Sequence, residues 1–193
     1  MTQFPGKAIV EPGLPEKVEM LNQLLDERAI PHAFGGALAL AYYTEPRATA
    51  DIDLNIFTAP SSYSEVAAAL ETLGVDRLAA PSEVERDGQG RLWWGRTPLD
   101  LFFAYDPFHE AMRERSRSVP FGAVEIPILA PEHLLVAKAH FDRRKDWLDI
   151  EQIMIASEGL DVTEVHRWLD HLVGPEDQRA RRVTQLESDL IGD

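Results

Sequence analysis

Two aspartates, spaced two positions apart, are the residues whose types and spacing are best suited to chemistry. Asp51 and Asp53 alternate with aliphatic side chains over Asp51–Phe57, the pattern of a β-strand with one polar face. Because side chains two apart on a strand project from one face, both carboxylates are expected to point the same way. Mg²⁺ prefers oxygen ligands and usually takes one or two carboxylates together with substrate phosphates. The pair predicts a site for Mg²⁺ (or Mn²⁺), although such a pair alone is more often a solvated strand edge or a calcium ligand.

A pair of glycines precedes the aspartates. Gly35 and Gly36 follow the short segment Pro31–Phe34, which is expected to be a strand, and precede Ala37–Tyr43, which has the small apolar side chains of a helix packed on a sheet. Two glycines at this junction permit a tight turn whose N–H groups can face a phosphate near the helix N-terminus. A glycine pair alone is more often only a turn, but beside two carboxylates it favours a phosphate cradle.

A third aspartate, Asp100, is an isolated charge in the otherwise apolar segment Pro98–Phe103. Burying an unpaired carboxylate costs free energy, so a metal ion or a cationic side chain is expected beside it. Two interpretations stay open at this point. Asp100 is either a third carboxylate of a metal site, or a structural partner of Arg96 or Arg47.

The segments around these residues are expected to form an α/β (α+β) fold with a mixed sheet flanked by helices. Further strands are predicted at Leu92–Trp94, Leu99–Ala104 and Val124–Leu129, with a hairpin-like break at Thr97-Pro98. Helices are predicted at Pro15–Arg28, Ser64–Leu73, Pro131–Phe141, Trp147–Ser157, Val162–Leu172 and Glu176–Leu190. The change to helical character predicts a core over residues 1–130 and a helical C-terminal subdomain over 131–193 that packs on it.

The composition limits the class of protein. The 193-residue chain carries a formal charge of −14 and has no cysteine, which excludes disulfides, thiolate zinc sites and a cysteine nucleophile. No segment has the length and apolarity of a membrane span or signal peptide, so a cytoplasmic protein without a membrane partner is expected. The acidic balance counts against general nucleic-acid binding. A basic cluster of Arg143, Arg144 and Lys145 facing the site would restore RNA as a partner.

The order of these motifs resembles the minimal nucleotidyltransferases of the DNA polymerase β superfamily. The stretch Arg47–Leu54, Arg-x-Thr-x-Asp-x-Asp-Leu, is closest to their bacterial abortive-infection and toxin-type branch. Leu134–Lys138 followed by Asp142–Ile150 is similar to that branch's helical motif. The resemblance covers residues 34–155 and implies a nucleotidyltransferase catalytic core within residues 1–130.

The resemblance also implies roles for individual residues. The metal-binding and catalytic positions would be Asp51, Asp53 and Asp100. The nucleotide-binding positions would be Gly35, Gly36, Ala37, Arg47, Thr49 and Lys138. Many relatives have a serine after the two glycines, and Ala37 lacks that hydroxyl, so contact there would rest on backbone donors.

Structural alternatives exist for several of these positions. Lys138 lies one helical turn before Asp142, so an ordinary surface ion pair is the competing interpretation. Arg47 and Thr49 either order the loop before the metal strand or contact the nucleotide. The segment Asp142–Asp149 is interpreted as a solvated, salt-bridged helix junction rather than as part of a site. The histidines at 133 and 140 are interpreted as incidental, and the aromatic pairs at 93–94 and 102–103 as core.

The implied reaction is transfer of a nucleoside monophosphate (NMP) from a nucleoside triphosphate (NTP) to a hydroxyl acceptor, with release of pyrophosphate. The acceptor would be tRNA, a protein or a small molecule, and a toxin-type enzyme would have a cognate antitoxin. The rival hypothesis is a catalytically silent module of a toxin–antitoxin pair that keeps only the fold. The geometry of the three aspartates discriminates between the enzyme and the silent module. If Asp100 points away from the other two into an ion pair, the silent module is favoured.

Overall fold

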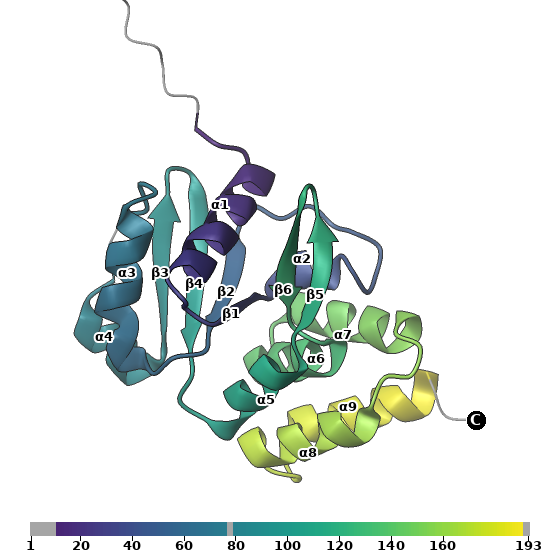
Figure 1. The fold of residues 1–193 in the computed structure, drawn as a ribbon. Helices are drawn as coiled ribbons and strands as arrows, with labels where there is room; N and C mark the ends of the chain where they lie inside the picture. The colour runs from purple at the N-terminus through teal and green to yellow at the C-terminus, as the bar shows by residue number, and fades with distance from the viewer. Residues whose placement is uncertain (1–10, 77–78, 191–193) are drawn as a thin grey trace, which may run out of the picture.

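A six-stranded sheet of mixed orientation forms the centre of the fold (Figure 1). The computed structural model describes residues 11–76 and 79–190. Within them the strands are β1 (His32–Phe34), β2 (Ile52–Ile56), β3 (Gln89–Trp94), β4 (Thr97–Phe103), β5 (Arg117–Phe121) and β6 (Val124–Ile128). Their order is β3-β4-β2-β1-β6-β5, with the β2–β4 and β1–β6 pairs parallel and the others antiparallel. This confirms the mixed sheet expected from the sequence.

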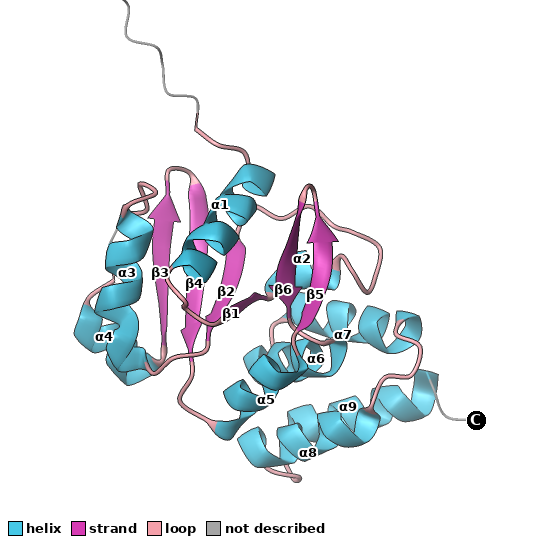
Figure 2. Cartoon of the chain, in the orientation of Figure 1, coloured by secondary structure: helices cyan, strands magenta, loops and turns pink. Residues whose placement is uncertain are grey.

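Helices flank the sheet (Figure 2). Those of the first 130 residues are α1 (Leu14–Glu27), α2 (Gly36–Leu40), the 3₁₀ turn η1 (Pro60–Ser62), α3 (Tyr63–Glu71), α4 (Pro81–Asp87) and α5 (Pro107–Arg115). Those that follow are α6 (Pro131–Phe141), α7 (Arg144–Ala156), α8 (Val162–Val173) and α9 (Gln178–Leu190). Figure 1 shows α1 in front of the sheet, α3 and α4 beside its β3 edge, and α5 to α9 grouped below it.

The alternation of side chains along β4 separates the core from the candidate site. Leu99, Leu101 and Phe103 are fully buried, whereas Asp100 and Phe102 lie on the opposite and more accessible face. Full burial of an aliphatic or aromatic side chain contributes about 1.5–3 kcal/mol to stability. The hydrophobic cluster that these side chains join also includes residues of α6, α7 and α8, so burial fixes which face of β4 carries Asp100.

The register of three neighbouring strands places two acidic residues and one basic residue in a row. Asp53 on β2 pairs with Asp100 on the parallel strand β4. Asp100 pairs in turn with Arg91 on the antiparallel strand β3. Directly paired residues in a sheet project from the same face, with Cβ atoms about 4.5–5.5 Å apart. The row runs across the sheet as Arg91, Asp100 and Asp53.

The β3–β4 hairpin turns at Gly95-Arg96, so the predicted break at Thr97-Pro98 is wrong. Gly95 adopts a φ of +59°, which suits the tight two-residue turn of a hairpin. Pro98 is tolerated because it stands near the beginning of β4, one residue before the pairing with β2 begins. The two-position shift in the turn changes which residue lies opposite Asp100.

Besides the 3₁₀ turn η1, three elements were not predicted, and several boundaries differ. Strand β5 is an exposed edge strand that contains Pro120, so it lacks the apolar alternation of a buried strand. Helix α5 begins at Pro107 after an aspartate cap, Asp106, whose carboxylate accepts the Phe108 N–H at 2.8 Å. Helix α4 is short and buries only one side chain. Helix α2 ends at Leu40, three residues earlier than expected.

The C-terminal segment is helical as expected. The division into a core over residues 1–130 and a subdomain over 131–193 stays a prediction. None of the helices in the described part of the chain has the length and apolarity needed to cross a membrane.

Candidate active site

The polar face of β2 carries three side chains in succession: Asp51 just before the strand, then Asp53 and Asn55. Alternation along the strand sends Ile52 and Leu54 into the core, where both are fully buried. The sequence predicted this arrangement of the two aspartates. Asn55 was not singled out, although its position in the same alternation was the available signal.

The glycine turn lies directly against Asp53. The Gly35 N–H donates to the Asp53 carbonyl at 2.9 Å, and Gly36 adopts a φ of +54°. A Cβ atom placed on Gly36 would lie 1.7 Å from the Asp53 Oδ2. Glycine at this position is therefore required by both the backbone angle and the closeness of the carboxylate.

Asp100 forms a bidentate ion pair with Arg91 rather than with Arg96 or Arg47. The Arg91 Nε–Asp100 Oδ1 distance is 2.6 Å and the Nη2–Oδ2 distance is 2.7 Å. The cation expected beside this strand aspartate is present, but on the neighbouring strand. Sequence reasoning missed it because a turn at Thr97-Pro98 would have placed Gly95 opposite Asp100.

The carboxylates interact electrostatically across the sheet. Burial, with additional repulsion from Asp51 and Asp100, raises the pKa of Asp53 from the ordinary 3.8 to about 6. Burial also disfavours the charged form of Asp51, but hydrogen bonds from Thr49 and from the Asp51 backbone, with attraction from Lys145 and Arg91, together outweigh burial and lower the pKa of Asp51. The neighbourhood therefore stabilises ionised Asp51 and destabilises ionised Asp53, which a bound cation would relieve.

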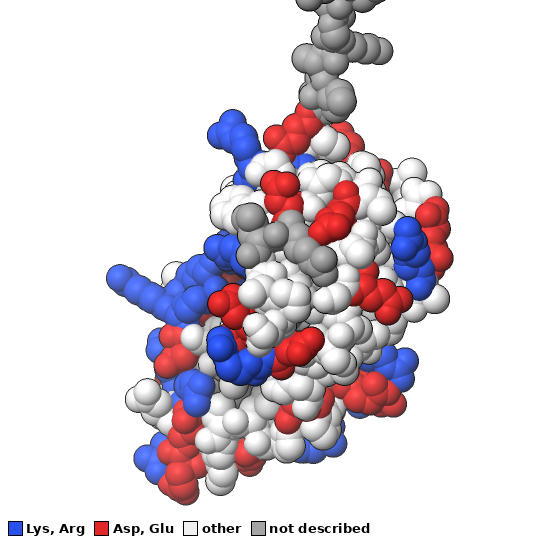
Figure 3. All heavy atoms as spheres, turned by 90° about the vertical axis from the view of Figure 1, so that its left-hand side faces the viewer, with Lys and Arg blue, Asp and Glu red and all other residues white. Residues whose placement is uncertain are grey.

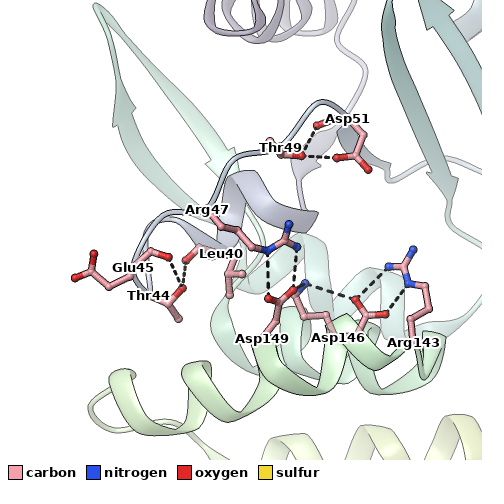
Figure 4. Close-up of polar contacts among 10 residues, drawn as sticks. Leu40, Thr44, Glu45, Arg47, Thr49, Asp51, Arg143, Asp146 and Asp149 are labelled. Carbon is pink, nitrogen blue, oxygen red and sulfur yellow. Dashed lines mark hydrogen bonds and ion pairs between the residues drawn. The ribbon is translucent and has the colours of Figure 1, made fainter.

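Thr49 and Arg47 both contact protein groups in the loop that leads into β2 (Figure 4). The Thr49 hydroxyl donates to the Asp51 carboxylate and, at 3.3 Å, to the Asp51 carbonyl. The Arg47 guanidinium reaches Asp149 on α7, with Nε–Oδ1 and Nη2–Oδ2 distances of 3.3 and 3.1 Å. These contacts support the loop-ordering interpretation. Nucleotide contact by either residue stays a prediction.

Lys138 is buried and pairs with α7, not with Asp142. Its Nζ lies 2.6 Å from the Asp149 Oδ2 and 3.9 Å from the Asp146 Oδ1. Burial disfavours the charged form of Asp149, but hydrogen bonds from Arg47 and Lys138 prevail and lower its pKa. The surface-pair interpretation of Lys138 is therefore wrong. Asp149 joins α6, α7 and the loop before β2 into one charged cluster.

The start of α7 is built by further ion pairs. Arg143 donates to Asp146 at 2.6 and 3.2 Å (Figure 4), and the Trp147 indole donates to Asp142 at 2.6 Å. The salt-bridged helix junction expected here is present. It is not wholly solvated, because Asp146 is fully buried beside Lys138.

Two hollows meet at Gly36, Asp53, Lys138 and Arg143. The larger is a cavity of about 370 Å³, and its aromatic and histidine lining comes from Phe102, Tyr105, Phe108, His109, His140 and Phe141. The smaller is a polar cleft of about 20 Å³, and it adds Ala37, Arg47, Asp51, Lys145 and Asp146. Phe102 and His140 therefore line the cavity. The interpretations of Phe102 as a core residue and of His140 as incidental are corrected by this position. Phe103 is core, as expected.

Most of the predicted site residues come together. Gly35, Gly36, Asp53 and Lys138 line the cavity, and Ala37, Arg47 and Asp51 line the adjoining cleft. Asp100 stands beside Asp53 in the sheet but is held by Arg91. Thr49 reaches the site through Asp51. The residues that sequence reasoning missed are Arg91, Asn55, Asp146 and Asp149, together with the aromatic wall of the cavity.

The donor set suits a hard divalent cation that also binds substrate. Across residues 11–76 and 79–190, no three His, Cys, Asp or Glu side chains are arranged to hold a metal by themselves. Mg²⁺ typically takes only one or two protein carboxylates and completes its shell with waters and phosphates. Asp51 and Asp53 can provide that number, and the repulsion that raises the pKa of Asp53 favours a cation there. The residues present therefore fit Mg²⁺.

The mixed sheet with its flanking helices is a nucleotidyltransferase fold. A family model described as nucleotidyl transferase AbiEii toxin, type IV TA system, matches residues 21–190. This chain belongs to that family of nucleotidyltransferases. No relative was found by a sequence comparison with curated proteins.

Solved structures show the same fold. The antibiotic-resistance factor ANT(2'')-Ia matches with a TM-score of 0.58 and 18% identity, covering 91% of this chain and 95% of that one. An antigenic nucleotidyltransferase-like protein from Paracoccidioides brasiliensis matches with a TM-score of 0.54 and 16% identity, covering 91% and 87%. The lincosamide adenylyltransferase LnuA, with lincomycin bound, matches with a TM-score of 0.53 and 13% identity, covering 74% and 97%.

The raised pKa of Asp53 leads to an expected pH dependence of stability when divalent cations are removed by EDTA. Between about pH 4 and 6 the folded chain keeps a proton that the unfolded chain has lost, so the Asp53 contribution to stability falls as pH rises. Asp53→Asn removes this titration. Denaturant unfolding at several pH values should show the variant gaining stability relative to wild type up to about pH 6–7. Parallel pH profiles for the two proteins would contradict the electrostatics described here.

Gly36→Ala is expected to damage the site more than the fold. An L-residue at positive φ costs about 1–2 kcal/mol of stability, and the added methyl would also displace the Asp53 carboxylate. A misplacement of about 1 Å can cost roughly 100-fold in rate. Gly159→Ala is the matched control, because Gly159 has a φ of +72° with no atom within 4 Å of an added Cβ. Unfolding and NMP-transfer assays on both variants should show similar stability losses but lost activity only for Gly36→Ala.

Proposed function

We propose that this chain is a Mg²⁺-dependent enzyme that transfers an NMP from an NTP to a hydroxyl acceptor and releases pyrophosphate. The observation that carries the proposal is the position of Asp53. Its carboxylate lies against the Gly36 backbone, between Asp51 on its own strand segment and Asp100 on the next strand. A phosphate cradle and a cation site thus share one wall, which is what in-line attack on a metal-bound triphosphate needs.

The residues have distinct proposed roles. Asp51 and Asp53 would hold Mg²⁺, which would neutralise charge developing on the phosphate oxygens. The backbone at Gly35, Gly36 and Ala37 would face the triphosphate. The acceptor oxygen bonds to the α-phosphorus, the bond to the bridging oxygen breaks, and pyrophosphate leaves with that electron pair. The proton of the acceptor hydroxyl passes to a carboxylate oxygen of Asp100.

The two hollows suggest where the rest of each substrate lies. The larger cavity begins at the glycine turn and continues to aromatic side chains such as Phe102 and Phe141, which suits a nucleobase. Lys138 and Arg143 stand where the two hollows meet, which suits phosphate oxygens. The polar cleft beside Asp51 is left for the acceptor.

We place a phosphate-bearing acceptor, RNA, first among the acceptor classes. Arg143 and Lys145 line the cleft, although Arg144 does not, and Arg47 and Lys138 add two more cations. The overall charge of −14 does not forbid this. On the face drawn in Figure 3, Lys and Arg side chains lie among Asp and Glu. A cytoplasmic toxin that modifies tRNA and is countered by a cognate antitoxin is the family role we propose for it.

Label transfer in a cell extract tests the proposal and the acceptor class together. Each of four α-labelled NTPs is incubated with the protein, Mg²⁺ or Mn²⁺, and extract, beside the Asp51→Ala/Asp53→Ala variant. We expect label in the RNA fraction with wild type only. Label in protein or small molecules would keep the chemistry but replace the acceptor. No carboxylate-dependent label with any NTP would favour the silent module.

A further inference from the structure

Arg91 is the one residue in the row across β3, β4 and β2 that the proposed chemistry does not use. It stands on the edge strand β3 directly opposite Asp100. Both hydrogen bonds from its guanidinium to the Asp100 carboxylate are short, at 2.6 and 2.7 Å. The Arg91 side chain is 54% exposed, whereas that of Asp100 is 17% exposed. The arginine can therefore swing into solvent while the aspartate stays beside Asp53.

The charge of Arg91 acts on all three aspartates. Hydrogen bonding and attraction from Asp100, followed by weaker attraction from Asp51 and Asp53, raise the pKa of Arg91. A divalent cation bound by Asp51 and Asp53 would meet the same cluster of carboxylates from the opposite side. Two cations that neutralise one carboxylate cluster compete, since each weakens the electrostatic attraction felt by the other.

We propose that Arg91 is a positioning residue: its guanidinium is the resident cation that holds the Asp100 carboxylate. A divalent cation must displace the Arg91 guanidinium before it can bind Asp100. Arg91 thereby sets the divalent-cation concentration at which the site is complete. This inference rests on the proposed function. It also reconciles the Arg91–Asp100 ion pair with catalysis, because an ion pair that opens on metal binding does not make the site silent.

Mn²⁺ binding in the absence of nucleotide and acceptor tests the inference. Free Mn²⁺ is measured by electron paramagnetic resonance as the full chain is titrated, and the variants are Arg91→Gln, Arg91→Lys, Asp53→Ala and Arg91→Gln/Asp100→Asn. We expect Arg91→Gln to bind Mn²⁺ roughly tenfold more tightly, a change of about 1.4 kcal/mol. Arg91→Lys should fall between wild type and Arg91→Gln because it keeps the charge but loses the fork. Arg91→Gln/Asp100→Asn should lose this gain in Mn²⁺ affinity, because the carboxylate that Arg91 releases is then absent.

Thermal unfolding gives a second readout. In EDTA, Arg91→Gln should melt below wild type because three neighbouring carboxylates then repel without a resident cation, and Mn²⁺ should raise its melting temperature more than that of wild type. Arg113→Gln is the control, because Arg113 forms a similar exposed ion pair with Glu110 on α5. It should leave Mn²⁺ affinity unchanged.

The outcomes separate this inference from the proposed function. If Asp53→Ala weakens Mn²⁺ binding but Arg91→Gln binds no more tightly than wild type, the metal site stands and the role of Arg91 is overturned. If Mn²⁺ binding is insensitive to Asp53→Ala, both fail. If Arg91→Gln unfolds and Mn²⁺ does not restore its fold, Arg91→Lys takes its place in the test. A Mn²⁺ affinity of Arg91→Lys equal to that of wild type would then overturn the inference.

Discussion

Asp53→Ala is expected to reduce NMP transfer by at least about 10³-fold without unfolding the chain. A metal contributes several kcal/mol of transition-state stabilisation, and each 1.36 kcal/mol corresponds to a factor of about ten in rate. Asp53 is the carboxylate that contacts the glycine turn and adjoins the other two. Burial and repulsion from neighbouring aspartates raise the pKa of Asp53 to about 6. Removing this carboxylate relieves that repulsion, so the melting temperature in EDTA should not fall.

The control for this result is Asp170→Ala, which removes an exposed aspartate from α8. Both variants are assayed for transfer at saturating Mg²⁺, with circular dichroism to verify the fold. Asp170→Ala should retain full activity. Retained transfer by Asp53→Ala would remove the basis for assigning the metal to this strand.

Asp149→Ala is expected to have the largest effect on stability, about 3–5 kcal/mol, because it leaves the buried Lys138 ammonium without its nearest partner. The side chains of Lys138 and Asp149 are only 6% and 5% exposed, and their charged atoms lie 2.6 Å apart. Arg47 would lose its partner as well. Urea unfolding at neutral pH measures the change. Glu110→Ala, which breaks an exposed pair, should leave the free energy of unfolding almost unchanged.

A double variant separates the structural part of this cluster from its functional part. Lys138→Met/Asp149→Leu replaces the buried pair by apolar side chains, which is often neutral for stability. It should recover most of the lost stability but still transfer poorly, because Lys138 lines both hollows. A double variant as unstable as Asp149→Ala would show that the pair is not the source of the cost. Full activity in that variant would exclude Lys138 from phosphate binding.

Local signals in the sequence predicted the part of the site built from one strand and one turn. The alternation at Asp51 and Asp53 and the glycine pair gave the strand, the turn and the shared face, because neither depends on distant contacts. The long apolar segments also predicted most helices and the central strands. Helix α5 also carries a local signal, because Asp106-Pro107 is an aspartate cap followed by a proline at the first helical position.

Pairings between distant segments could not be predicted in the same way. The partner of Asp100 depends on the hairpin register, and a turn placed two residues away changes that partner from Arg91 to Gly95. The partner of Lys138 depends on how α6 packs against α7, which brings Asp149 closer than Asp142. The cavity forms only where several helices and strands meet, β2, β4, α5 and α6 among them, so Phe102 is indistinguishable from a core residue until the sheet is assembled.

The fate of the two ends of the triphosphate tests the central claim most directly. Matched reactions with α-labelled and γ-labelled NTP, in Mg²⁺ and in EDTA, are compared for wild type and Asp51→Ala/Asp53→Ala. We expect the α label on the acceptor and the γ label in pyrophosphate, only with wild type and Mg²⁺. Transfer of the γ label to the acceptor, or α-label transfer that persists without the two carboxylates, would contradict NMP transfer at this site.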